Sequence, residues 1–211
     1  MTSDEGAAVI VLHGHGAPPG DAVDLASRLA GDGAAVGVAL DGPVALGDGT
    51  LAWFDSATLD GLESSIEVIR ATVRERRPVS SRVVVVGLSQ GAAAAVAALG
   101  EASSPQIDAL VLWSGFAVEP SGRDLELDGL DGVAVLVVHG DADDVVPLWM
   151  ADDLAVLLDR SGALVSRMTI AGGGHRRGAS TIEAVARWIH GNADRSTDGS
   201  RDGSADGSVV R

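Results

Sequence analysis

The sequence predicts an α/β fold built on a doubly wound, mostly parallel sheet. Short runs of β-branched and other apolar residues recur along the chain, and each ends in Gly or a small polar residue. The runs are continuously apolar rather than alternating, which is typical of strands buried on both faces of a parallel sheet. Segments with helical periodicity separate them. Strands and helices in rotation indicate right-handed crossovers with helices flanking the sheet.

The pattern places each element in turn. The predicted strands are Val9–Leu12, Ala35–Ala39 (the weakest pattern), Val83–Val86, Ala109–Trp113, Val135–His139 and Ser166–Ile170. The predicted helices between and after them are Asp21–Ala30, Leu59–Arg76, Gln90–Leu99, Leu148–Asp159 and Ala179–His190. In the second helix, Leu62, Ile66, Ile69 and Val73 fall at i, i+4, i+7 and i+11, so they form one apolar stripe that can face a sheet.

Length and composition predict one domain. The chain has 211 residues, 46% of them hydrophobic, which suits a single globular unit over residues 5–190. Within this unit, the loop Ala117–Gly132 is the only segment that could cover an active site, so we expect no separate lid domain. Asp-Gly-Ser repeats at residues 198, 202 and 206 carry nothing apolar, and we expect residues 191–211 to form a disordered, solvated acidic tail rather than a calcium site.

The charge balance bears on the partners and the cellular environment of the protein. The chain has no Cys, and its 30 acidic residues outnumber 15 basic ones, all Arg, for a net charge of -15. Nucleic acid and anionic membrane surfaces would repel such a chain. The acid excess also suits a protein adapted to high salt. No apolar run is long enough to span a membrane, and the N-terminus lacks the features of a secretory signal, so we expect a cytoplasmic protein.

One motif indicates a serine nucleophile. Residues 87–91 read Gly-Leu-Ser-Gln-Gly, which matches the pattern Gly-x-Ser-x-Gly. In a Gly-rich chain this match alone is weak evidence, because the same residues could form a turn with no catalytic role. The position of the motif favours a catalytic serine, since the motif directly follows one predicted strand and opens the helix Gln90–Leu99, as a nucleophile elbow requires. The sequence therefore predicts that Ser89 is a nucleophile.

A serine nucleophile needs a base and a group that orients the base. His175 follows the last predicted strand on a loop that begins Gly172-Gly173-Gly174, at the edge where parallel sheets bind ligands. We therefore predict that His175 is the base. Three carboxylates, Asp141, Asp143 and Asp144, follow the strand before it, and position alone does not select the orienting acid among them.

These motifs resemble those of the phospholipase/carboxylesterase group of α/β-hydrolases, which includes the acyl-protein thioesterases. The resemblance spans nearly the whole domain and rests on Leu12-His13-Gly14-His15-Gly16, Trp53-Phe54-Asp55, the elbow at 87–92, Ser114-Gly115-Phe116, His139-Gly140-x-x-Asp143-x-Val145-Val146-Pro147 and Gly174-His175. It implies a single-domain α/β-hydrolase without a large lid. It selects Asp143 as the acid, and it implies that the backbone N–H groups of His15 and Gln90 form an oxyanion hole.

The resemblance also bears on the pocket and the substrate. His15 replaces a usually apolar residue, and its imidazole either lines the pocket or faces solvent. Trp53 is either a substrate contact or a buried anchor, and Phe116 is a candidate pocket residue. We expect hydrolysis of small to medium acyl esters through an acyl-enzyme, since the short segment after Ser114 argues against a long acyl channel. A thioesterase, a small-peptide hydrolase or a catalytically silent binding module is the alternative. No metal or cofactor is implied, and the sequence indicates no oligomeric state.

Overall fold

A parallel sheet forms the centre of the molecule, as predicted. The computed structural model describes residues 6–33, 35–119, 124–191 and 209–210. The sheet has the strand order β2-β1-β5-β6-β7-β8-β9, and every neighbouring pair is parallel. Its strands are β1 (Ala8–Leu12), β2 (Val36–Leu40), β5 (Val83–Leu88), β6 (Ala109–Trp113), β7 (Ala134–Gly140), β8 (Leu164–Ile170) and the two-residue β9 (Val209–Val210). The fold class is therefore confirmed.

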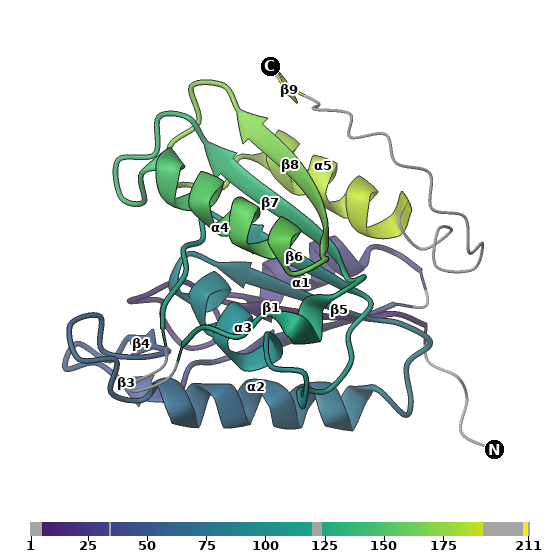
Figure 1. Cartoon of the computed structure of the whole chain (residues 1–211), viewed down its shortest axis with the longest axis horizontal. Helices are drawn as coiled ribbons and strands as arrows, with labels where there is room; N and C mark the ends of the chain where they lie inside the picture. The colour runs from purple at the N-terminus through teal and green to yellow at the C-terminus, as the bar shows by residue number, and fades with distance from the viewer. Residues whose placement is uncertain (1–5, 34, 120–123, 192–208, 211) are drawn as a thin grey trace.

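Helices cover both faces of this sheet (Figure 1). They are α1 (Val23–Ala30), α2 (Leu62–Arg76), α3 (Gln90–Leu99), α4 (Leu148–Arg160) and α5 (Ala179–Gly191). Alternate residues of each central strand point to opposite faces, so the strands divide their side chains between two cores. Ile10 and Val85 pack with α2, α3 and α4. Val9 and Val84 pack with α1 and α5 on the other face.

The helix α3 is packed into the core on one face of the sheet, and its sequence explains how. All ten of its residues are buried, and six of them are Ala. Short side chains let the helix axis approach the sheet, and a longer side chain would force the layers apart. The segment after β6 is packed equally closely against this helix, because a Cβ on Gly115 would lie 2.7 Å from Cβ of Ala92. This helix carries the nucleophile motif at its N-terminus, so the motif is held rigidly.

The order of the strands reverses next to β1. From β1 the chain continues to β2 on one side, and it crosses to β5 on the other side before proceeding outward through β6, β7 and β8. Ligands of open α/β sheets bind at the carboxyl ends of the strands on either side of such a reversal. Leu12 is paired with Gly87 across these two strands, so the loops after β1 and β5 begin side by side.

Some features were not predicted. A small antiparallel hairpin, β3 (Val44–Ala45) with β4 (Leu51–Ala52), follows β2, and a 3-10 turn η1 (Asp128–Leu130) precedes β7. Such short elements carry too little periodicity to be read from a sequence. The predicted tail lies outside the described residues, except for Gly191 at the end of α5 and the strand β9. Within the described residues, no helix is long and apolar enough to span a membrane.

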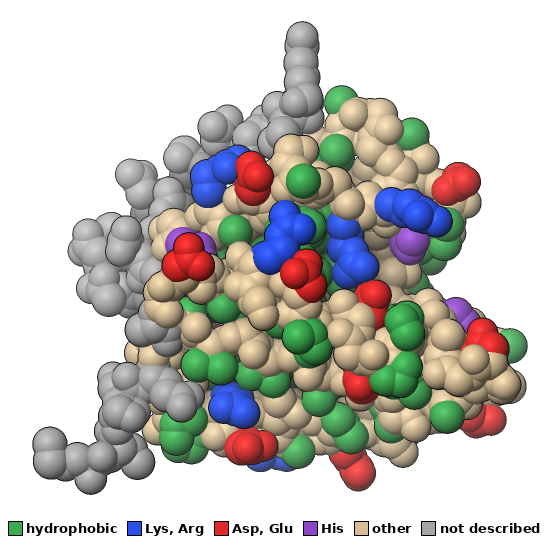
Figure 2. Space-filling model, turned by 180° about the vertical axis from the view of Figure 1, so that it is seen from behind, with side chains coloured by type: hydrophobic (Ala, Val, Ile, Leu, Met, Phe, Trp, Pro, Cys, Tyr) green, Lys and Arg blue, Asp and Glu red, His purple; other side chains and the backbone are tan. Residues whose placement is uncertain are grey.

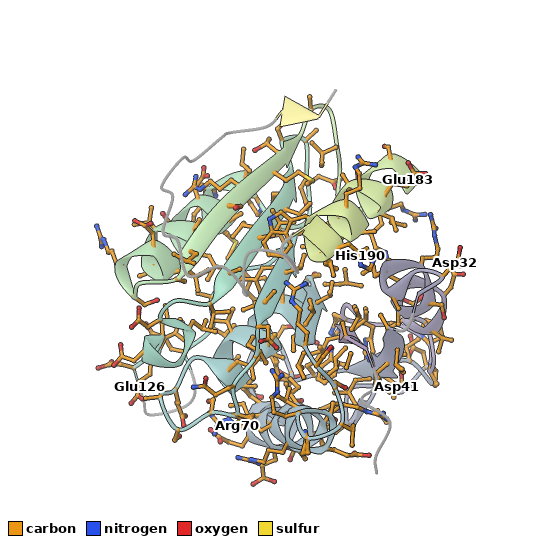
Figure 3. The ribbon with its side chains drawn as sticks, turned by 90° about the vertical axis from the view of Figure 1, so that its right-hand side faces the viewer. Asp32, Asp41, Arg70, Glu126, Glu183 and His190 are labelled. Carbon is orange, nitrogen blue, oxygen red and sulfur yellow. The ribbon has the colours of Figure 1, made fainter. Side chains whose placement is uncertain are left out.

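The face formed by α1 and α5 is mixed in charge. Figure 2 shows Arg side chains interspersed with Asp and Glu over the described part of this face. Arg177 near the start of α5 lies 3.4 Å from Asp21, just before α1. His190, at the end of α5, is exposed, and it lies toward the opposite end of this helix from Glu183 (Figure 3). Cations at a helix C-terminus interact favourably with the helix dipole, and this is the position expected for His190.

Candidate active site

Ser89 lies on a strained turn between β5 and α3. Its φ is 51° and its ψ is −116°, a conformation that a residue with a side chain adopts only when its surroundings enforce it. The flanking glycines make the turn sterically accessible. A Cβ on Gly87 would lie 2.4 Å from Cα of Ala92, and a Cβ on Gly91 would lie 2.4 Å from O of His13. The motif therefore has Gly at both positions because backbone passes directly against them.

His175 and Asp143 lie in line with Ser89. Nε2 of His175 is 3.1 Å from Oγ of Ser89, and its Nδ1 is 2.8 Å from Oδ2 and 3.1 Å from Oδ1 of Asp143. The side chain of His175 is 25% exposed and that of Asp143 is fully covered. The three residues that the sequence indicated, on loops after β5, β7 and β8, are thus brought together. Asp144 is exposed in the same loop as Asp143.

The surroundings of Asp143 keep its carboxyl group ionised. Burial by itself raises its pKa, but hydrogen bonds donated by the backbone N–H of Val146 and by His175 outweigh this effect and lower the pKa below the ordinary Asp value. Oδ1 also accepts a bond of 3.0 Å from the N–H of Val145. An ionised carboxylate accepts hydrogen bonds and donates none. Nδ1 of His175 is therefore the donor, and Nε2 presents its lone pair to Ser89.

The loops that carry the acid and the base are bonded to each other. The N–H of Ala142 donates to O of Gly173 over 2.9 Å, and Oδ1 of Asp141 accepts the N–H of Gly172 over 2.6 Å. The contact is close enough that a Cβ on Gly140 would lie 2.1 Å from O of Gly173. Position along the sequence had left Asp141 among the candidate acids. Its carboxylate instead tethers the loop of His175, a role that no sequence signal indicated.

A second buried histidine lies behind Asp143. Nε2 of His139 is 2.7 Å from O of Val146 and 3.5 Å from Oδ2 of Asp143. A carbonyl only accepts, so Nε2 of His139 is the protonated nitrogen and donates to Val146. The same N–H stabilises the nearby carboxylate electrostatically. The sequence analysis placed His139 at the end of a strand and at the start of a family motif, and it assigned no contact to this side chain.

The other side of Ser89 is formed by the loop after β1. A Cβ on Gly14 would lie 3.5 Å from Cβ of Ser89, so backbone passes beside the serine there. The N–H of Gln90 belongs to the first residue of α3, where helical N–H groups have no intrahelical acceptor. Of the two amides that the resemblance implies, that of His15 thus comes from the loop that passes beside Ser89, and that of Gln90 from the helix that begins directly after Ser89. Gly16 continues the first loop by donating its N–H to O of Leu51 over 2.9 Å.

The two open alternatives at His15 and Trp53 have distinct placements. The side chain of His15 is exposed and lies near Asp48 and Asp55. The pKa values of both carboxyl groups are lowered, chiefly by hydrogen bonds from Thr50 to Asp48 and from Thr58 to Asp55. Electrostatic interaction with His15 is one of the smaller causes in each case. Trp53 is 0% exposed, which is the position of a buried anchor. Phe116 is half-buried and packs against the core that includes α2, α3 and α4.

The described residues contain no group of three or more His, Cys, Asp or Glu side chains that could hold a metal ion. The arrangement at Ser89 is one that can perform acyl transfer with protein groups alone: a hydroxyl, an imidazole that accepts from it, an ionised carboxylate behind the imidazole, and a helix N-terminus beside the hydroxyl. The helix end adds partial positive charge where negative charge develops.

The fold and this arrangement define the class of protein as an α/β-hydrolase. Solved structures with the same fold include esterase PE8, with 23% identity, 90% of this chain and 96% of that chain covered, and a TM-score of 0.72. The Bacillus cereus carboxylesterase has 21% identity, coverages of 90% and 91%, and a TM-score of 0.71. A carboxylesterase from Mesorhizobium loti has 23% identity, coverages of 88% and 88%, and a TM-score of 0.70. At these identities the likeness shows the fold.

The family follows from the sequence itself. Residues 2–192 match the model of the phospholipase/carboxylesterase family, and the chain belongs to that family. The resemblance described above is therefore confirmed. A comparison with curated proteins gives no match.

Proposed function

We propose that this protein is a serine carboxylesterase in which Ser89 is the nucleophile, His175 the general base and Asp143 the residue that orients the base. The observation that carries the proposal is the continuous line of contacts from Oγ of Ser89 through both ring nitrogens of His175 to the carboxylate of Asp143. Membership of the phospholipase/carboxylesterase family supports an ester as the substrate.

The geometry supports the following course. Oγ of Ser89 attacks the ester carbonyl while Nε2 of His175 takes its proton, and Asp143 stabilises the imidazolium that forms. The carbonyl oxygen becomes an oxyanion, which accepts hydrogen bonds from the N–H groups of His15 and Gln90, each worth about 3 kcal/mol in such sites. His175 then gives the proton to the departing alcohol. Water, deprotonated by His175, attacks the acyl-enzyme and releases the acid and free Ser89.

A groove beside the segment that follows β6 is a candidate site for the acyl group. It has a volume of about 730 Å³, and its described lining includes Leu59, Ala117, Val118 and Leu157. Two of its lining residues belong to segments that border the site. Leu59 is three residues after Ser56, whose hydroxyl is 3.3 Å from Nε2 of Gln90, and Ala117 is four residues after Trp113, whose carbonyl accepts the N–H of Ser89. Glu119 and Asp124 also line it, so a neutral acyl chain of small to medium length suits it better than an anionic one.

The test is the variant Ser89→Ala with p-nitrophenyl esters of increasing chain length. We expect hydrolysis to be abolished while the melting temperature stays nearly unchanged, and we expect the wild type to be labelled covalently by a fluorophosphonate. Undiminished activity of purified Ser89→Ala would refute the assignment. A folded wild type that takes no label would favour a binding protein of the same fold, and faster turnover of acyl thioesters or small peptides would favour those alternatives.

The proposal also concerns the environment in which the protein works. The 30 acidic residues, twice the number of basic ones, suit a protein of a cytoplasm of high ionic strength, because salt there screens the repulsion among surface carboxylates. Thermal unfolding in low and in molar KCl tests this point. A melting temperature that does not rise with salt would contradict it.

A further inference from the structure

His13 is buried at the junction of the loops that surround Ser89. It directly follows β1, its side chain is 0% exposed, and its ring lies 5.2 Å from that of Trp53, centroid to centroid. The hydrogen bonds of its ring go to backbone groups of Gly14 and Gly42 rather than to Ser89 or His175. A fully buried imidazole must have its polar atoms satisfied by the protein, and both nitrogens of His13 are.

The partners of His13 fix its tautomer. The backbone N–H of Gly42 donates to Nε2 over 2.8 Å, and a backbone N–H can only donate. Nε2 is therefore unprotonated, and the proton of the neutral ring is on Nδ1. Nδ1 lies 2.6 Å from O of Gly14, so its N–H donates to that carbonyl. The ring thus links Gly42, in the chain after β2, to the peptide group between Gly14 and His15 in the loop beside Ser89.

The carbonyl of Gly14 determines where the next N–H points. The peptide bond between Gly14 and His15 is trans. In a planar trans peptide the C=O and N–H point in opposite directions, so a bond that fixes the carbonyl also fixes the N–H. That N–H belongs to His15, and it is one of the two oxyanion donors of the proposed function. A donor of this kind contributes fully only if it is aimed before the reaction begins.

Two more buried groups connect this histidine to the second donor. The indole N–H of Trp53 donates to O of His13 over 2.8 Å, and the backbone N–H of Trp53 donates to Oε1 of Gln90 over 2.9 Å. Nε2 of Gln90 donates to O of Phe54 over 2.8 Å. The side chain of Gln90 therefore holds the segment that holds His13, while its backbone supplies the other donor. Both donors are connected through one buried set of hydrogen bonds.

We propose that His13, in its Nδ1–H tautomer, is a positioning residue that aims the N–H of His15 at the oxyanion, and that Trp53 and Gln90 keep it in register with the nucleophile. The inference rests on the proposed function for its catalytic consequence. Its structural half, the tautomer and the bond to Gly14, does not depend on any activity.

Two substitutions separate the bonds of His13. In His13→Asn the amide nitrogen takes the place of Nδ1 and can still donate to Gly14, but the acceptor for Gly42 is lost. In His13→Gln the amide oxygen takes the place of Nε2 and can still accept from Gly42, but the donor to Gly14 is lost. Both variants shorten or alter the same buried side chain, so each serves as the matched control for the other.

We expect kcat to fall about tenfold in His13→Gln, a fraction of the loss that follows complete removal of an oxyanion donor, and clearly less in His13→Asn. KM should stay the same in both, because the donors act on the oxyanion rather than on bound ester. Inhibition by a trifluoromethyl ketone, which binds serine hydrolases as a tetrahedral oxyanion, should weaken in parallel with kcat. A larger or equal loss of kcat in His13→Asn, or losses that simply follow the melting temperature, would overturn the inference.

Nitrogen NMR of the wild type completes the test. Near neutral pH, the ring of His13 should carry its proton on Nδ1, and a proton on Nε2 overturns the inference whether or not the protein hydrolyses esters. A wild type without esterase activity contradicts the proposed function and, with it, the catalytic half of the inference. If neither His13 variant folds, Trp53→Phe removes the indole N–H bonded to O of His13, together with part of the buried ring. We expect a lower kcat at constant KM there, and an unchanged kcat overturns the inference.

Discussion

The two sides of Ser89 are built in different ways. On one side, His13 and Trp53 are fully buried and Gln90 nearly so, and their hydrogen bonds join strand ends, the hairpin region and α3. On the other side, His175 lies on a loop of mostly exposed residues, and its own ring is one-quarter exposed. Its position depends on side-chain bonds to Asp143 and on the contacts between two loops.

The difference corresponds to what each side does in the proposed reaction. Oxyanion donors stabilise developing charge best when they need no reorganisation, so a buried and fully bonded framework suits them. The base accepts a proton, returns it and admits water, so it must remain accessible to solvent and substrate. The comparison teaches that rigidity here comes from the core, whereas access comes from the loops. Substitutions on the two sides should therefore fail in different ways.

The largest effect is expected from Asp143→Asn. If the amide oxygen keeps the bonds to Val145 and Val146, the amide nitrogen faces Nδ1 of His175 as a donor, and the ring must place its proton on Nε2, where it cannot accept the proton of Ser89. We expect kcat to fall by about 10⁴-fold, as for other triads whose base is held in the wrong tautomer. Steady-state kinetics measures this, and Asp144→Asn, in the same loop but exposed, is the control. A greater loss in Asp144→Asn would move the role of the acid to that residue.

A substitution in the buried framework should affect stability as well as rate. Gly91→Ala places a Cβ 2.4 Å from O of His13 and 2.8 Å from O of Leu12, both of them backbone atoms that cannot move aside cheaply. We expect a loss of about 1–3 kcal/mol in unfolding free energy, together with a lower kcat. Gly33→Ala is the control, because a Cβ there would meet nothing within 4 Å. Denaturant unfolding of both variants measures the contrast, and equal stabilities would show that the framework tolerates displacement.

The loop side offers a milder test at Asp141. Asp141→Ala removes the acceptor of the N–H of Gly172, on an exposed carboxylate. A hydrogen bond of this kind is worth about 1 kcal/mol or less, so we expect kcat to fall only about threefold, with little change in melting temperature. Kinetics and thermal unfolding measured on one preparation check both halves. A change confined to the melting temperature would mean that the tether stabilises the fold without placing the base.

The smallest effect concerns pH and stability. The folded-state pKa of Asp143 lies below its ordinary value, so ionisation of this group stabilises the fold above the unfolded pKa of about 3.9, and the contribution is lost as the pH falls through the folded pKa. Asp143→Asn lacks this contribution. We expect the difference in unfolding free energy between wild type and variant to be constant near neutral pH and to shrink below about pH 4. A difference that grows on acidification would contradict the direction of the pKa shift.

Local patterns predicted the elements that are long or fully buried. The ranges of β6 and α3 agree with the predicted Ala109–Trp113 and Gln90–Leu99 at both ends. The predicted helix at Leu59 begins later, at Leu62, because Leu59 itself has φ of 63° and lies in the turn before α2. The hairpin β3–β4 was missed because strands of two residues carry no periodicity.

What the sequence determined by itself is therefore the alternation of strands and helices, the sharp turn at Ser89 and the chain order of the serine, the acid and the histidine, because these depend on neighbours a few residues apart. Spacing alone left the acid open, and the family resemblance selected Asp143. Only the tertiary structure shows the contact between Asp143 and His175, that Asp141 binds a backbone N–H instead, and that His13 and Trp53 join one buried set of bonds. These features depend on which atoms from distant segments meet, and on the direction in which each hydrogen bond is donated. Neither is encoded in local spacing.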